Sequence, residues 1–115
     1  MRDICHPVKS PIRQLEAAAA QRCGVSVAEL RGKTRTRRVA LARKAVYLAA
    51  RRLTCQPSYP EIGSAMGRDH TSVMYGVRSA RALEVSSPWF ASLMHDLAQL
   101  DSVERPVVIR YRVAS

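Results

Sequence analysis

A polar run at the start of a helical pattern carries the side chains best suited to recognise nucleic acid. His70, Thr71 and Ser72 are followed at helical spacing by Tyr75 and Arg78, and these five positions are predicted to face outward. They donate or accept hydrogen bonds or offer a methyl group, which is the chemistry needed to read base edges in the major groove. An ordinary helical hairpin with a polar solvent face would show the same pattern. On this stretch alone both interpretations stay open.

A second group of side chains has the charge needed to bind phosphate. Nine basic residues and no acidic residue lie between Arg31 and Arg52. Like charges at this density repel one another, so the run is not expected to serve stability. Its functional interpretation is a surface that follows the DNA backbone, and its alternative is a basic face exposed only to solvent. The positions expected on that face, off the apolar stripe of their helix, are Arg43, Lys44, Tyr47 and Arg51.

Two short helical patterns would position the base-reading group. Ser58 and Glu61 have the spacing of a capping box, which predicts the start of one helix. Gly67 can end that helix, because glycine adopts the left-handed conformation without a Cβ clash, and Asp69 is a good N-cap for the next. Two helices that meet at one glycine suit a helix-turn-helix. The predicted inward positions are Ile62, Ala65 and Met66 in the first helix and Val73, Val77 and Ala80 in the second.

The remaining segments predict an all-α fold of about six helices in a compact domain with N- and C-terminal arms. One helix should begin with Ser10 as N-cap and end at Gly24, and a short one should run from a Ser26 capping box to Gly32. A longer helix from about Arg37 and a last one after Ser87 show apolar stripes at helical spacing. These stripes are Val39, Ala42, Val46, Ala49 and Leu53 in the longer helix, and Phe90, Leu93, Leu97 and Leu100, with Trp89 and Met94 beside them, in the last.

We therefore divide the chain into an arm at residues 1–9, a helix-turn-helix domain at residues 10–101 and a tail at residues 102–115. The tail alternates Ile109, Tyr111 and Val113 with two arginines, which suggests a half-buried strand. A lone strand has no partner in an otherwise helical chain. Pairing with a second copy, binding of a partner protein, contact with DNA and disorder are all open for this segment.

Composition restricts the partners. The 115 residues carry a net charge of +10, which favours an anionic partner, either nucleic acid or an anionic membrane surface. No stretch approaches the roughly 18 apolar residues of a membrane span, and the N-terminus lacks the apolar segment of a signal peptide, so we expect a cytoplasmic, nucleoid-associated protein. Cys5, Cys23 and Cys55 lack the spacing of zinc or redox sites, and Cys23 is expected to be a small buried apolar residue.

Catalysis is not expected. The chain has three histidines and scattered acidic residues, with no paired carboxylates and no metal-binding constellation, so we predict neither an enzyme nor a cofactor. Gly32, Lys33 and Thr34 have the order that ends a phosphate-binding loop. The first glycine of that motif would fall at Val27, and no strand pattern precedes it. We therefore reject nucleotide binding at this segment.

Three segments together make the sequence recognisable. GRDHTSV at residues 67–73, LRGKTRTRRVALARKAVYLA upstream and SYPEIGSAMG between them resemble the C-terminal DNA-binding domain of DnaA, the bacterial chromosomal replication initiator. The resemblance covers about residues 11–100, with the motifs in the order of the family. It implies an all-helical domain that inserts one helix into the major groove and reaches an adjacent minor groove with a basic loop.

The resemblance also implies roles for individual residues. Asp69, His70, Thr71 and Ser72 match a signature that faces bases and phosphates. Arg43 matches an arginine that reaches base edges, and Arg35 matches the loop arginine of the minor groove, whose negative potential attracts such a side chain. The full predicted DNA-binding set is Lys33, Arg35, Arg37, Arg38, Arg43, Lys44, Arg51, Ser58, Pro60, Arg68, Asp69, His70, Thr71, Ser72, Tyr75 and Arg78.

The sequence departs from the family pattern at several points. One glycine precedes Arg68 where many relatives have two, and one extra residue lies between Thr54 and Ser58. Ser72 replaces a threonine and so loses a methyl group that could pack on thymine, while Lys44 replaces a glutamine that could pair with adenine. We therefore expect a site preference that differs from the usual one of the family.

The ATPase module that normally precedes this domain would not fit within 115 residues. We therefore expect a stand-alone, site-specific binder of double-stranded DNA that acts as a transcriptional regulator without ATPase activity. The alternatives are a modulator of replication initiation that competes for initiator sites, and a module that binds a partner protein.

Overall fold

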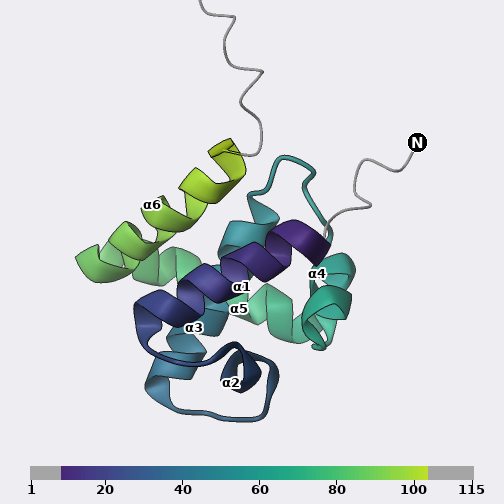
Figure 1. Cartoon of the computed structure of the whole chain (residues 1–115), viewed down its shortest axis with the longest axis horizontal. Helices are drawn as coiled ribbons and strands as arrows, with labels where there is room; N and C mark the ends of the chain where they lie inside the picture. The colour runs from purple at the N-terminus through teal and green to yellow at the C-terminus, as the bar shows by residue number, and fades with distance from the viewer. Residues whose placement is uncertain (1–8, 104–115) are drawn as a thin grey trace, which may run out of the picture.

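Polar caps and glycines set the ends of most helices in the computed structural model, which describes residues 9–103. Over that range the chain forms α1 (Lys9–Cys23), α2 (Val27–Arg31), α3 (Arg37–Arg51), α4 (Tyr59–Met66), α5 (His70–Ser86) and α6 (Pro88–Val103) (Figure 1). Both predicted capping boxes are present. The Ser26 and Ser58 hydroxyls accept from the amides of Glu29 and Glu61, at 3.0 and 3.2 Å, and each glutamate accepts from the serine amide in return. The all-α prediction is confirmed.

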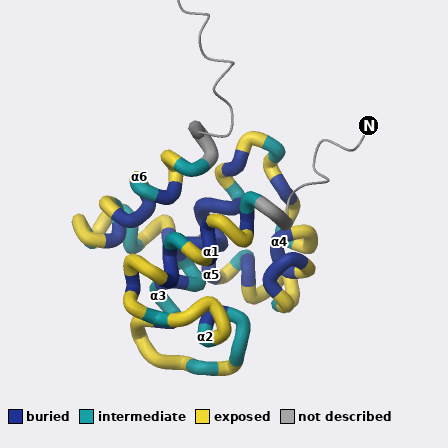
Figure 2. The backbone as a smooth tube through the Cα atoms, viewed as in Figure 1, coloured by how far each residue is buried: buried dark blue, intermediate teal, exposed yellow. Residues whose placement is uncertain are grey.

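Helix α3 lies at the centre of the fold and contacts each of the other five helices among the described residues. The helix packs against α1 on one side and α5 on another, and α6 also contacts it. All five residues of its predicted stripe are buried. So are Ala45, Leu48 and Ala50, and Figure 2 shows how much of the backbone here belongs to buried residues. The single predicted stripe therefore underestimated how much of the α3 surface is buried, because a helix enclosed by several neighbours is apolar over most of its surface.

Tyr47 is the clearest correction to the sequence prediction. We expected it on the exposed basic face of α3, but its side chain is only 5% exposed. The cause lies across the interface, where Gly76 of α5 has no side chain. A Cβ built on Gly76 would lie 2.2 Å from Cδ2 of Tyr47, so the ring fills the space that any larger residue would occupy. Burial raises the pKa of the Tyr47 phenol, which keeps it neutral.

Other differences concern the ends of the fold. Helix α1 begins at Lys9, so Ser10 lies inside the helix and is not its N-cap. Helix α6 extends to Val103, two residues beyond the expected domain boundary. Trp89, expected beside the inner face, is 51% exposed because it precedes the first buried residue of that face, Phe90. The Ile109 to Val113 strand prediction lies outside the described residues.

A partly buried ion pair joins α1 to the first arginine of the basic run. The carboxylate of Glu16 in α1 is 1% exposed and accepts from Arg31 of α2 at 2.8 Å. Arg31 also donates to the carbonyl of Ala65 in α4 at 3.2 Å, so one guanidinium ties three helices together. Cys23 is buried as predicted, and burial raises the pKa of its thiol. No helix among residues 9–103 has the length and apolar character needed to cross a membrane.

Candidate nucleic-acid interface

The helix-turn-helix is built from α4 and α5 with Gly67 between them, as predicted. Gly67 has φ 72° and ψ 34°, a left-handed conformation that glycine adopts without strain. Gly63 allows the turn to fold tightly against α4, since a Cβ there would lie 2.4 Å from the carbonyl oxygen of Arg68. The carboxylate of Asp69 accepts from the amides of Thr71 and Ser72, at 3.2 and 3.5 Å. Asp69 therefore begins α5, and the direction of this helix is fixed by its neighbours.

The outward face of α5 carries the predicted base-reading group. His70, Thr71, Ser72 and Arg78 are exposed, and the Tyr75 ring is 63% exposed. The Arg78 guanidinium lies over that ring, 5.9 Å from its centroid. The inward positions Val73, Val77 and Ala80 are buried, as predicted. The first turn of α5 thus presents hydroxyl groups and an imidazole that no other helix covers.

An open hollow of the surface lies where α3 and α5 meet. Arg43, Lys44 and Tyr47 line it from α3, and Ser72, Tyr75 and Ser79 line it from α5. Lys44 and Ser72, two positions at which the resemblance led us to expect a departure from the family pattern, therefore share one concavity. Ser79 was not predicted, although it lies two helical turns beyond Ser72, and that spacing is the signal that could have identified it.

Four predicted cations lie in the α2–α3 loop (residues 32–36) and at the start of α3. They make no hydrogen bond or ion pair with another residue in the described range 9–103. Lys33, Arg35, Arg37 and Arg38 are all exposed. In Figure 1 this loop lies at the end of the molecule opposite the C-terminal end of α6. The loop also adjoins the helix-turn-helix, because Arg68 in the turn donates to the carbonyl of Gly32. The start of the loop and the turn are therefore in direct contact.

Arg43 and Arg68 lie at this contact and are bound to the protein itself. Arg43 donates to the carbonyls of Leu30, Glu29 and Gly32 at 2.9, 2.9 and 2.7 Å. Burial lowers the pKa of the Arg43 guanidinium, and the nearby positive charge of Arg68 lowers it further. The resemblance gave Arg43 a base-reading role, which remains a prediction. In this structure all of the hydrogen bonds that it makes are to α2 and the residue after it.

The other predicted contact residues lie around the start of α4. The Arg51 guanidinium stacks 4.2 Å from the centroid of Tyr59 and donates to the carbonyl of Pro57 at 3.0 Å. The hydroxyl of Ser58 is engaged in the capping box, and Pro60 is exposed in the first turn of α4. Arg51 and Ser58 therefore have structural partners, whereas Pro60 is available for contact.

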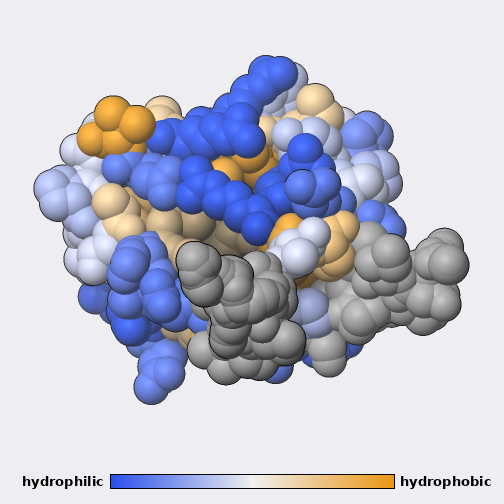
Figure 3. Space-filling view, turned by 90° about the horizontal axis from the view of Figure 1, so that it is seen from above, coloured by the Kyte–Doolittle hydropathy of each residue, from blue (hydrophilic) through white to orange (hydrophobic). Residues whose placement is uncertain are grey.

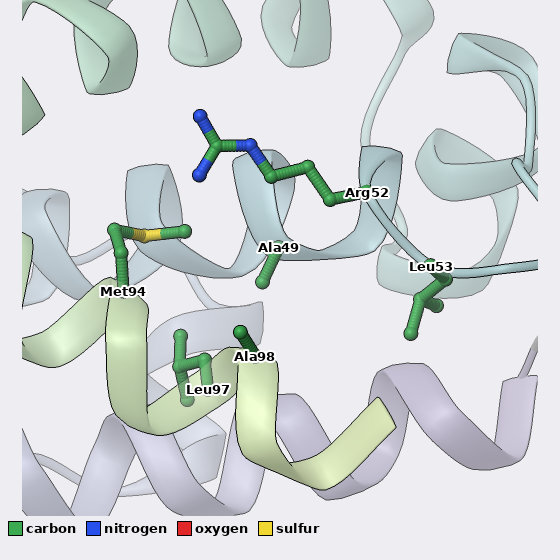
Figure 4. Close-up of a pocket in the computed structure, with 6 residues that line it drawn as sticks. All are labelled: Ala49, Arg52, Leu53, Met94, Leu97 and Ala98. Atoms are coloured by element: carbon green, nitrogen blue, oxygen red, sulfur yellow. The ribbon is translucent and has the colours of Figure 1, made fainter. Parts of the chain in front are cut away.

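The hollow between α3 and α6 is much smaller than the one between α3 and α5. It is lined by Ala49, Leu53, Met94, Leu97 and Ala98, with Arg52 at its edge (Figure 4). Its volume of about 60 Å³ has room for only one or two water molecules. On the face seen in Figure 3, long hydrophilic side chains (blue) partly cover an apolar area (orange). Among residues 9–103, no cluster of three or more His, Cys, Asp or Glu residues could hold a metal ion.

Comparison with known proteins agrees with this geometry. Residues 12–79 match the family described as bacterial dnaA protein helix-turn-helix. The chain is 38% identical over 90 residues to the chromosomal replication initiator protein DnaA of Caulobacter vibrioides (strain NA1000 / CB15N), covering 77% of this chain and 18% of that protein. It is 37% identical over 79 residues to the protein of that name from Psychromonas ingrahamii, covering 68% and 17%. The chain thus spans less than a fifth of the length of these relatives. The matched residues include α4, the turn and most of α5, and the chain belongs to the family of bacterial DnaA helix-turn-helix domains.

Proposed function

We propose that this chain binds double-stranded DNA at specific sequences, with α5 in the major groove and the α2–α3 loop in an adjacent minor groove. Membership of a helix-turn-helix family supports DNA binding. The observation that carries the sequence-specific part is the exposed first turn of α5, with His70, Thr71 and Ser72. Arg68, two residues before this helix, donates to Gly32 at the start of the basic loop. Neutral donors and acceptors beside cations are what a protein needs to read bases while it holds phosphates.

The loop and the helix would have different tasks. Lys33, Arg35, Arg37 and Arg38 are exposed cations, so they are suited to phosphates and to the negative potential of a narrow minor groove. The hollow between α3 and α5 combines the Lys44 ammonium with the Ser72 hydroxyl and the Tyr75 ring. Because the resemblance gives glutamine and threonine as the usual family residues at the positions of Lys44 and Ser72, we expect base preference to differ from that of the family at the base pairs nearest this hollow.

Regulation of transcription is the role that we propose for such binding, without ATP hydrolysis by these residues. The Gly32, Lys33 and Thr34 segment lies between two helices, and no strand precedes it among residues 9–103. A phosphate-binding loop requires that strand and an earlier glycine, where this chain has Val27. A nucleoid location would follow from such binding.

Selection of bound sites from random duplexes tests the proposal most directly. An enriched motif would support sequence-specific reading. Retention of all duplexes alike would mean that a net charge of +10 binds DNA without reading it. Fusing the motif to a reporter promoter, with and without the protein, then tests the regulatory role.

A second candidate function is competition for the sites of a replication initiator, because the relatives are named chromosomal replication initiator proteins. The same selection tests it. If the selected motif matched the sites bound by such an initiator, the chain would compete for them. Displacement of a purified initiator from one duplex would support that function. Binding of a partner protein or a second copy through the tail remains a prediction, which sedimentation of the whole chain with and without residues 102–115 would test.

A further inference from the structure

Two arginines from distant elements meet on the same backbone carbonyls. Arg43 reaches from α3 to the carbonyls of Glu29, Leu30 and Gly32. Arg68 reaches from the turn of the helix-turn-helix to two of these, Leu30 at 3.2 Å and Gly32. The two guanidinium groups therefore share acceptors at the exact point where the α2–α3 loop begins.

Electrostatics explains why two like charges can lie together here. The last carbonyls of a helix have no intrahelical partner and carry the negative end of its dipole, so they favour cations. Each carbonyl oxygen has two lone pairs and can accept from both arginines. The Nη2 atom of Arg68 bonds to these carbonyls, while its buried Nε has no partner. The contact is thus directed at α2 rather than at the turn from which Arg68 comes.

The backbone of Arg68 is held in place by contacts on both sides, as its guanidinium group is. Gly67 sits in the left-handed conformation directly before it, and the Arg68 carbonyl packs against Gly63 of α4. Asp69 directly after it caps α5. A short chain of fixed contacts therefore connects the start of the recognition helix to the start of the basic loop.

We infer that Arg43 and Arg68 are positioning residues, which hold the α2–α3 loop at a fixed distance from α5 and thereby set the spacing between minor-groove and major-groove contacts. The inference rests on the proposed function. In this inference both arginines act on DNA binding by holding the loop in place, and they do not read bases directly. Arg35, exposed three residues beyond Gly32, is the side chain whose placement would depend on them.

Replacement by lysine separates the two roles. Lysine keeps the positive charge, so a simple phosphate contact survives, but one ammonium group cannot reproduce the planar fork that spans several carbonyls. We therefore choose Arg68→Lys, with Arg43→Lys as a second variant in case the first does not fold. Arg13→Lys is the matched control, because Arg13 is exposed on α1, away from the loop.

Coupling to Arg35 is the decisive measurement. On the duplex selected for the parent chain, we expect Arg35→Ala to lower affinity about tenfold, the scale of one good contact. In the Arg68→Lys background the same change should lower affinity less than twofold, because the loop is no longer held in place. In the Arg13→Lys background it should again cost about tenfold. A tenfold loss in every background, or no loss in the parent, would overturn the inference.

Amide hydrogen exchange of the free protein gives a second readout. Residues 33–36 should exchange faster in Arg68→Lys or Arg43→Lys than in the parent, while α6 stays unchanged. Unchanged exchange in the loop would contradict the positioning role even if DNA affinity fell. Failure of the proposed function would look different, because the parent chain itself would then show no preference among duplexes.

Discussion

Replacing Gly76 with alanine tests the packing that holds α5 on the rest of the domain. In an exposed helix interior this change would stabilise the protein by about 1 kcal/mol, because alanine has the higher helix propensity. Here the new Cβ would lie 2.2 Å from Cδ2 and 2.7 Å from Cε2 of Tyr47. Overpacking of this kind costs about 1 to 3 kcal/mol, and such short distances place it near the upper end. We expect a net loss of about 2 kcal/mol in the free energy of unfolding.

Urea denaturation followed by circular dichroism would measure this loss. Two further variants identify its cause. The double variant Gly76→Ala/Tyr47→Leu should lose less stability than the sum of the two single variants, since the smaller leucine side chain makes room for the methyl group. Ala82→Gly, at an exposed position of the same helix, should lose only the propensity difference of about 1 kcal/mol. A Gly76→Ala protein that unfolds at higher urea concentration than the parent would refute the packing argument.

Three further predictions follow from the geometry. The hydrogen bond from Arg52 lowers the pKa of Glu84 below its usual value of 4.5. The pair therefore stabilises the fold above pH 4.5, and this contribution is lost as the pH falls through the lowered pKa. Both side chains are partly exposed, so thermal melting of Glu84→Gln should show a cost of about 0.2 to 1 kcal/mol at pH 7 and none at pH 2. Val77→Asp places an unpartnered carboxylate at a position that is 1% exposed and should remove most of the helical circular dichroism; a parent-like melt would contradict the assigned inner face. Arg37→Ala should weaken all duplexes equally and reduce the slope of log affinity against log salt by about 0.9, whereas an unchanged slope would mean that Arg37 contacts no phosphate.

Local signals made most of the fold predictable. Ser26, Ser58, Asp69 and Gly67 define helix ends through contacts within four residues, so their spacing in the sequence is sufficient. Apolar periodicity located the inner faces of α3, α5 and α6 for the same reason. These features depend on neighbours along one helix, which a single sequence records.

Contacts between distant segments were not predictable. Burial of Tyr47 depends on Gly76, which lies 29 residues further along the chain on another helix. Likewise, nothing local to Arg43 or Arg68 indicates that both would bind the carbonyls of α2. The family resemblance had placed Arg43 among the residues that reach base edges. The set of DNA-binding residues stays a prediction from the sequence, and the structure separates the exposed cations in that set from those already engaged within the protein.

The central claim, that α5 reads bases, is tested most directly by Thr71→Ala. Thr71 is exposed in the first turn of α5, and the substitution removes its hydroxyl without changing the net charge. Its amide still donates to Asp69, so the helix cap survives, which a parent-like melting curve would verify. Affinities for the selected duplex and a random duplex would be measured by fluorescence anisotropy at one salt concentration. We predict a loss of about 1 to 3 kcal/mol on the selected duplex and almost none on the random one; equal losses on both would contradict base reading by this residue.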